Sequence, residues 1–102
     1  MPRMSFIAKL VVKPEKAKEF EELQVKLRDL TFENEPGTPI YELLRDRDTP
    51  NTYMCVATFD DEAAFEFHQQ TDFHDALVPP ILECLASDME LSFYDSLEKV
   101  GD

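Results

Sequence analysis

Two segments of this sequence, residues 5–12 (SFIAKLVV) and 52–59 (TYMCVATF), are apolar at almost every position. Both are rich in β-branched and aromatic residues, which favour strands. Successive side chains of a strand point to opposite faces of its sheet, so both faces here carry apolar side chains. An antiparallel sheet with one face in water would show a cleaner polar alternation. We therefore expect a sheet that is covered on both sides.

The first covering layer is a predicted amphipathic helix. Between Pro14 and Asn34, apolar residues recur every three or four positions, which places them on one helical face. The letters KP before this stretch suit a first helical turn, and the letters EPG after it should end the helix. The expected buried stripe comprises Ala17, Phe20, Leu23, Leu27 and Leu30.

A β-hairpin is predicted next along the chain. Residues 40–46 (IYELLRD) and 52–59 have strand character, and the letters RDTPN between them have turn chemistry. Two paired antiparallel strands are the simplest result.

Two short helices and a last strand complete the chain. Asp60 can N-cap a helix to about residue 70, and Thr71 or Asp72 can cap a second one. The letters PP should break or kink the second helix, which then resumes briefly in ILECLA. Residues 89–97 (MELSFYDSL) form the predicted last strand.

The order of these elements predicts an α+β fold in a single domain over residues 1–102. Its simplest form is a ferredoxin-like, four-stranded antiparallel sheet with helices on one face. The other apolar face then needs a cover, so we expect a homodimer in which two sheets pack face to face. A chain of 102 residues buries a limited core, which also favours a partner.

Charge is divided unevenly along the chain. Residues 1–47 hold nine acidic and nine basic side chains, whereas residues 48–102 hold thirteen acidic and one basic. The net charge of −12 therefore belongs to the second half, and its field disfavours nucleic acid and anionic lipid as partners. A polyanionic substrate would need Lys9, Arg45 or Arg47 in its pocket.

Other features of the sequence bound the class of protein. The N-terminal letters MPRMSFIAKL contain no hydrophobic segment long enough for export or membrane insertion, so we expect a cytoplasmic protein. Cys55 and Cys84 are expected to be reduced, buried packing residues. The histidines and cysteines show no spacing typical of metal ligands, so we expect no metal site.

Three segments resemble the antibiotic biosynthesis monooxygenase domain, of the dimeric α+β barrel superfamily. They are VVKPEKAKEFEEL, EPGTPIYELLRDRDTPNTYMCVATFDD and AAFEFHQQTDFHDAL, and the resemblance runs from about Phe6 to Tyr94. The second segment is specific, because its EPG, YEL, RD and PNT features occur in the order and at the spacing of the family.

The resemblance implies a small dimer with a pocket between each sheet and its own helices. Monooxygenase members oxidise electron-rich quinol-type or polycyclic rings with dioxygen and neither metal nor flavin, so no cofactor is expected. This chemistry requires a base that deprotonates a phenol or an anthrone inside a dry, apolar box. Other members degrade haem or isomerise a phosphorylated sugar.

His68 is the predicted catalytic residue. It follows Phe65 by three positions and Ala64 by four, so the three side chains share a helical face that we expect to point inward. The resemblance matches His68 to a pocket-lining histidine of the family, and a histidine can serve as the base. The competing interpretation is a buried histidine that only bonds to a carbonyl or a carboxylate.

His74 is a weaker candidate. The second histidine of the family usually stands one residue earlier and precedes an aromatic residue, whereas this chain reads Phe73-His74. A surface or capping role therefore competes with substrate contact. A position in the first turn of a helix should lower the pKa of His74, while Asp72 and Asp75 should raise it.

The aromatic residues near His68 are predicted to form the apolar box around it. The resemblance also shows positions at which this chain differs from the family. Many members carry glutamate and then tryptophan at the end of the third strand, where this chain has Ala57-Thr58-Phe59. Leu10, His68 and Val78 stand where haem-degrading members carry asparagine, tryptophan and histidine, so we expect no haem chemistry. The predicted substrate-binding residues are Tyr41, Phe59, Phe65, Phe73 and His74.

Three functions remain open on the sequence. The first is a cofactor-independent monooxygenase that acts on a small aromatic diol, a quinol-like ring or a related enolisable compound. The second is an isomerase of a small ketone-bearing metabolite, which needs the same acid and base groups without oxygen. The third is a non-catalytic dimer that binds a small molecule.

Overall fold

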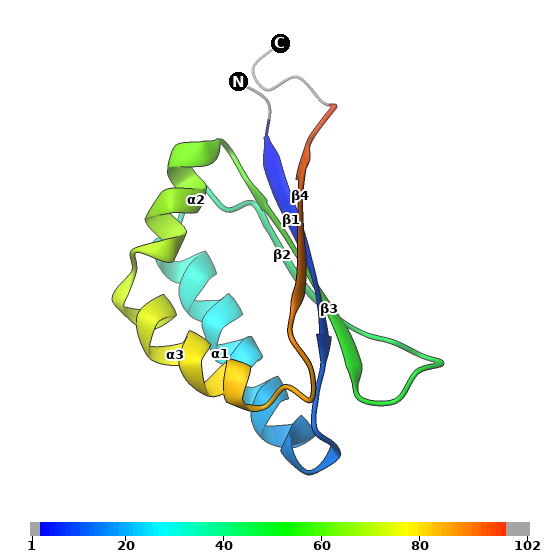
Figure 1. Cartoon of the computed structure of the whole chain (residues 1–102). Coiled ribbons are helices and arrows are strands. Elements are labelled where there is room, and N and C mark those ends of the chain that lie inside the picture. The colour runs from blue at the N-terminus through cyan, green and yellow to red at the C-terminus, as the bar shows by residue number, and fades with distance from the viewer. Residues whose placement is uncertain (1–2, 98–102) are drawn as a thin grey trace.

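The computed structural model describes residues 3–97, so the predicted domain over 1–102 extends beyond the described part at both ends. Four antiparallel strands form one sheet in the order β2-β3-β1-β4. The strands are β1 (Met4–Val11), β2 (Ile40–Arg45), β3 (Thr52–Phe59) and β4 (Glu90–Asp95). All the helices lie on one face of the sheet (Figure 1). The predicted ferredoxin-like α+β fold is confirmed.

The helices match the predicted ones in number and order, with differences at their ends. A 3-10 turn, η1 (Pro14–Lys16), leads into α1 (Ala17–Asn34), and α2 (Glu62–Gln69) and α3 (Asp72–Glu83) follow β3. The N-cap of α2 is Asp61, whose side chain accepts from the Ala64 amide, so the assignment of this cap to Asp60 is wrong.

Helix α3 runs without a break through Pro79 and Pro80, so of the predicted break or kink the break is wrong. The segment predicted to resume the helix ends early, because α3 stops at Glu83. Leu77 and Ile81, one turn apart on either side of the prolines, are both buried against the rest of the core. Tertiary packing of this apolar face outweighs the loss of the two proline amide donors.

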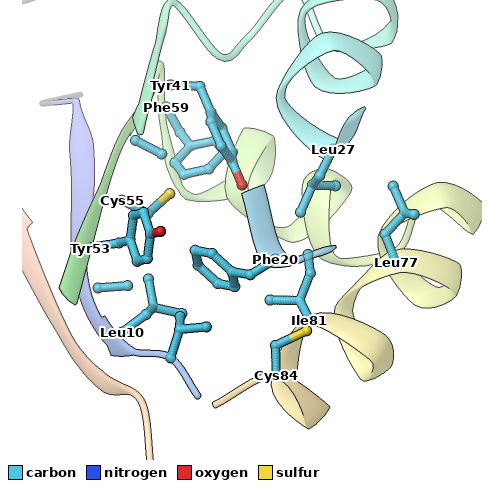
Figure 2. Close-up of a cluster of buried hydrophobic side chains, with 13 residues drawn as sticks. Leu10, Phe20, Leu27, Tyr41, Tyr53, Cys55, Phe59, Leu77, Ile81 and Cys84 are labelled. Carbon is cyan, nitrogen blue, oxygen red and sulfur yellow. The ribbon is translucent and has the colours of Figure 1, made fainter. Parts of the chain in front are cut away.

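The register of the sheet decides which side chains face the helices. Phe6, Ala8 and Leu10 of β1 pair with Ala57, Cys55 and Tyr53 of β3, and paired residues share a face. These alternate positions of both strands form the inner face, and most of their side chains are buried. Figure 2 shows Leu10, Tyr53, Cys55 and Phe59 facing Phe20 and Leu27 of α1 and Ile81 of α3.

The buried line of α1 differs from the predicted apolar stripe. Its buried residues are Phe20, Gln24, Leu27 and Thr31, and the C-cap residue Glu35 continues the line. Phe20 and Leu27 belong to the predicted stripe, whereas Leu23 and Leu30 are only partly buried. Helix α1 thus carries polar side chains into the interior at regular turns.

Candidate functional site

His68 is placed by the short helix α2, which starts at its Asp61 cap. The histidine occupies the last turn of α2, on the side that faces the sheet, and its exposed fraction is 2%. The predicted inward direction of His68 is confirmed. Its Nδ1 lies 3.0 Å from both carboxylate oxygens of Glu35.

Glu35 comes from the far end of α1 and is as buried as the histidine, with an exposed fraction of 3%. Its amide donates to the Thr31 carbonyl and so closes the last turn of the helix. Thr38 donates a hydroxyl hydrogen bond to Oε1 at 3.4 Å, and its amide donates to the Glu35 carbonyl. The carboxylate is therefore held by the loop that follows α1 as well as by His68.

Gly37 explains the EPG letters at this turn. A Cβ at Gly37 would lie 2.9 Å from the Cβ of Ala64 on α2, closer than side chains approach. The Gly37 carbonyl also accepts from the Asp60 amide at 2.8 Å, which fixes the loop to the end of β3. The missing side chain lets the loop that carries Glu35 pack directly on the helix that carries His68.

Aromatic rings surround the imidazole of His68. The ring centroids of Phe59 and Tyr41 lie 5.4 and 6.0 Å from it, and Phe65 packs edge-on against Phe59 at 5.2 Å. The ring of His74 packs edge-on against His68 at 4.9 Å. His74 is half-buried there, so the surface role does not fit the structure, although its amide does bond to the Thr71 cap.

A cavity of about 190 Å³ lies between the inner face of the sheet and the helices. Three of the predicted site residues besides His68 line it: Tyr41, Phe65 and His74. Phe59 stands behind the imidazole, and Phe73 packs on the core outside the cavity lining. The lining comprises Phe6, Ala8, Leu10, Gln24, Leu27, Tyr41, Cys55, Phe65, His68, Gln69, His74, Val78, Ile81, Leu82, Met89 and Leu91.

Burial favours the neutral forms of three ionisable side chains that line the cavity, Tyr41, Cys55 and His74. Burial raises the pKa of Tyr41 far above its usual range, and Cys55 and Glu35 add to the effect. Burial also raises the pKa of the Cys55 thiol to about 11, although a bond from Tyr41 opposes it. The pKa of His74 is lowered by burial and then by His68, against Asp75. The sequence left opposing influences on the pKa of His74, and in the structure the pKa is lowered with burial as the largest cause.

The raised pKa values of Tyr41 and Cys55 determine which hydrogen-bonding roles their side chains can have. Tyr41 stays a phenol that can donate, and Figure 2 shows its hydroxyl directed from the sheet toward α1. Cys55 stays a thiol, which agrees with a packing role rather than a nucleophile. Both cysteines are free and buried, as the sequence predicts.

A second cleft, of about 160 Å³, lies on the other side of Gln24, between α1 and the strands β2 and β3. Its charged groups are paired with one another. Arg45 forms two 2.9 Å bonds to the carboxylate of Glu21, which also accepts from the Tyr53 hydroxyl at 2.6 Å, and Arg28 bonds to Asp29.

Two residues of the site were not predicted from the sequence. Glu35 was noted only as part of a helix stop, and Gln24 was not considered. The signal for both was their spacing, because they continue the three-and-four rhythm of Phe20 and Leu27.

Residues 3–97 contain neither a candidate metal site nor a candidate membrane-spanning helix. No three histidine, cysteine, aspartate or glutamate side chains of this part gather as a possible metal site. No helix in it has both the length and the apolar character that a membrane crossing requires.

Comparison with known families gives a match to the antibiotic biosynthesis monooxygenase domain over residues 4–79. The chain belongs to this family. The match includes Gln24, Glu35, His68 and His74, whereas the part of the cavity lining formed by Ile81, Leu82, Met89 and Leu91 lies beyond it. Membership indicates a monooxygenase-like or small-molecule-binding function. The comparison with curated proteins gave no match.

Solved structures agree with the family assignment. A Caulobacter crescentus protein named for the same family superposes with a TM-score of 0.91 at 27% identity, covering 95% of this chain and 92% of that one. A conserved Methanosarcina mazei protein gives a TM-score of 0.87 at 29% identity, covering 92% of each chain. A Nitrosomonas europaea relative, with a TM-score of 0.89 at 18% identity and coverage of 97% and 94%, supports the fold alone.

Proposed function

We propose that this protein is a cofactor-independent monooxygenase of a small aromatic diol or related enolisable compound, with His68 as its base. The observation that carries the proposal is His68 in the wall of a mostly apolar cavity, bonded to the buried carboxylate of Glu35. A carboxylate that accepts from Nδ1 fixes the imidazole tautomer and leaves Nε2 as a proton acceptor.

The proposed reaction begins with transfer of a phenolic proton to Nε2 of His68. Glu35 stabilises the imidazolium that forms, as a buried carboxylate does in other acid-base sites. The electron-rich ring anion then gives electrons to dioxygen, and a carbon-oxygen bond forms to give a ring peroxide. Cleavage of the oxygen-oxygen bond, with loss of the ring hydrogen and return of the proton held by His68, leaves a new carbonyl and releases water. The substrate supplies all four electrons, so no external reductant is required.

Tyr41 and the apolar lining support this chemistry. A neutral phenol at Tyr41 can donate a hydrogen bond to the oxygen of the ring anion, which stabilises the charge where it develops. The apolar walls keep water away from the anion and from the peroxide.

The size of the cavity favours a single ring as substrate. An engineered apolar cavity of about 150 Å³ holds benzene, and the cavity here is about 190 Å³. One ring with small oxygen substituents therefore fits better than an anthrone.

Oxygen uptake by the purified, metal-stripped protein tests the proposal. We would compare benzenediols with naphthalenediols in the wild-type protein, in His68→Ala and in Glu35→Gln. Phe67→Ala is the matched control, because Phe67 is an exposed neighbour of His68 on the same helix. Loss of uptake in His68→Ala but not in the control is expected, whereas undiminished uptake in His68→Ala would refute the role of the base.

A second candidate, an isomerase of a small ketone-bearing metabolite, is favoured by the contact between two imidazoles. His68 and His74 lie 4.9 Å apart by their ring centroids, so one could remove a proton while the other returns it at a neighbouring atom. Turnover of an enolisable ketone under strict anaerobiosis would support the isomerase and exclude the oxygenase as the main activity.

We further propose that the protein is a homodimer formed through the outer face of the sheet. Ile7 pairs with Val56, and Met54 lies between Lys9 and Leu44, so apolar side chains are contiguous on the face without helices. Light scattering should give twice the chain mass, and a monomer at micromolar concentration would contradict this proposal.

A further inference from the structure

Gln24 is a buried amide without an evident structural partner. It lies in the middle of α1, with an exposed fraction of 6%, on the helical line that also carries Phe20, Leu27 and Thr31. Its Oε1 is enclosed and has no hydrogen-bond partner among residues 3–97. Burial of an unpaired amide opposes folding, and a leucine would continue the apolar face at no such cost.

Gln24 stands in the wall between the cavity of His68 and the cleft of Arg45. On the cleft side, Glu21, Arg45 and Tyr53 are satisfied by one another, and none of them bonds to the amide. On the cavity side, Gln24 belongs to the lining together with Leu27 and Tyr41, and its Oε1 forms no hydrogen bond with a described residue there. A ligand in the cavity is therefore the available partner for this amide.

The position of Gln24 along α1 sets the shape of that ligand. Gln24 precedes Glu35 by eleven residues, which corresponds to about 16 Å along the helix axis. Glu35 holds His68, so the amide and the imidazole reach the cavity from positions far apart along α1. Oxygen atoms on opposite sides of one ring match this arrangement better than adjacent ones.

We propose that Gln24 is a specificity-determining residue that binds a second oxygen substituent of the ligand, para to the one that faces His68. This assignment rests on the proposed function for the role of His68, but the contact to Gln24 is a matter of binding alone. A glutamine amide can accept from a hydroxyl and, after rotation, donate to a carbonyl, so it suits both a diol and the quinone formed from it.

Anaerobic titration tests this contact without turnover. The probes are hydroquinone, catechol and phenol, which share one ring and differ only in the second hydroxyl. The wild-type protein should bind hydroquinone about five- to tenfold more tightly than phenol, as expected for one buried hydrogen bond, and more tightly than catechol. Calorimetry or chemical-shift changes would give the dissociation constants.

The decisive variant is Gln24→Met, which keeps the length of the side chain and removes the amide. Its affinity for hydroquinone should fall to that for phenol, while its affinity for phenol stays within twofold of the wild-type value. Gln70→Leu, which removes an exposed amide outside the cavity lining, is the matched control and should keep the wild-type ratio. Gln24→Leu repeats the test with a different shape if the methionine variant folds poorly.

Two results would overturn the proposal: an unchanged hydroquinone-to-phenol ratio in the folded Gln24 variants, or no binding of hydroquinone by the wild-type protein at millimolar concentration. The outcome is separable from that of the oxygenase proposal. Loss of the ratio in Gln24→Met without oxygen uptake in any protein would support the binding site and reject the oxygenase. Oxygen uptake that depends on His68, together with an unchanged hydroquinone-to-phenol affinity ratio in Gln24→Met, would support the oxygenase and reject the binding role of Gln24.

Discussion

Glu21 of helix α1 and Glu35 at its C-cap both have paired carboxylates, and the two pairs differ in burial and in partner. Glu21 near its start bonds to Arg45 and Tyr53, and the Arg45 side chain is 68% exposed. Glu35 at its end bonds to His68, and both side chains are almost fully buried. Water can solvate either member of the first pair, whereas each member of the second depends on the other.

The comparison shows which of these two carboxylate pairs can take part in proton transfer to or from a ligand. In the outer pair, hydrogen bonds from Tyr53 and, to a smaller extent, from Arg45 lower the pKa of Glu21. This carboxylate therefore stays ionised and bonded to these two side chains. His68 of the inner pair lines a mostly apolar cavity, where a proton can be exchanged with a ligand. Burial, rather than charge pairing, separates the candidate site from the surface.

The largest expected effect is that of His68→Leu, which breaks the inner pair. It leaves the Glu35 carboxylate buried without its main partner, so we expect the free energy of unfolding to fall by about 3 kcal/mol. Urea denaturation of both proteins at neutral pH measures the loss. The double variant with Glu35→Leu should recover most of it, and a double variant as unstable as His68→Leu would contradict this account.

Gly37→Ala should disturb the pair of Glu35 and His68 by displacing the backbone of the loop that carries Glu35. The added methyl group would meet Ala64 at 2.9 Å and push the Glu35 loop away from α2. We expect a loss of about 1–3 kcal/mol in unfolding free energy, typical of overpacking. The double variant with Ala64→Gly makes room for the methyl group and should restore part of the loss. A fully stable Gly37→Ala protein would mean that the loop moves without cost.

His74 adds a pH dependence to the inner region. Burial and His68 lower the pKa of His74, so the unfolded chain takes up this proton more readily, at about pH 6.5. The stability that His74 contributes is therefore present above about pH 6.5 and is lost as the pH falls through that value toward the lower, folded pKa. Denaturation midpoints measured between about pH 7 and 5.5 should decline less in His74→Gln than in the wild-type protein. Parallel declines would exclude this contribution.

The smallest effect should come from Arg45→Leu, which breaks the outer pair. Because Arg45 is exposed and Glu21 keeps its bond from Tyr53, we expect a change of less than about 1 kcal/mol. The pKa of Glu21 should move back toward its ordinary value, which carboxyl NMR titration can follow. A loss as large as that of His68→Leu would remove the distinction between the two pairs.

The sequence predicted the elements that local patterns determine. The β-branched and aromatic residues of 52–59, the spacing of Phe20 and Leu27, and the chemistry of the hairpin turn each act over a few residues, and the structure has these elements where they were expected. The inward direction of His68 followed from its spacing to Ala64 and Phe65 in the same way. These predictions needed no knowledge of distant contacts.

The site itself depends on contacts that local patterns do not contain. Glu35 and His68 are 33 residues apart, and nothing between them indicates that they meet. Gln24 was passed over because a buried stripe was identified by apolar residue types, not by spacing alone. Pro79 and Pro80 were predicted to interrupt α3, since the packing of Leu77 and Ile81 on their two sides appears only in the folded chain.

The alternation of apolar and polar residues along the buried line of α1 has a consequence for protein engineering. Replacement of Gln24 by an apolar residue should raise the melting temperature, and selection for thermostability alone would favour it. The variants that survive heating best would then be those that have lost ligand discrimination. A laboratory evolution experiment on this chain therefore needs a binding screen alongside the thermal one. Without it, selection would raise the melting temperature at the expense of ligand discrimination in the cavity.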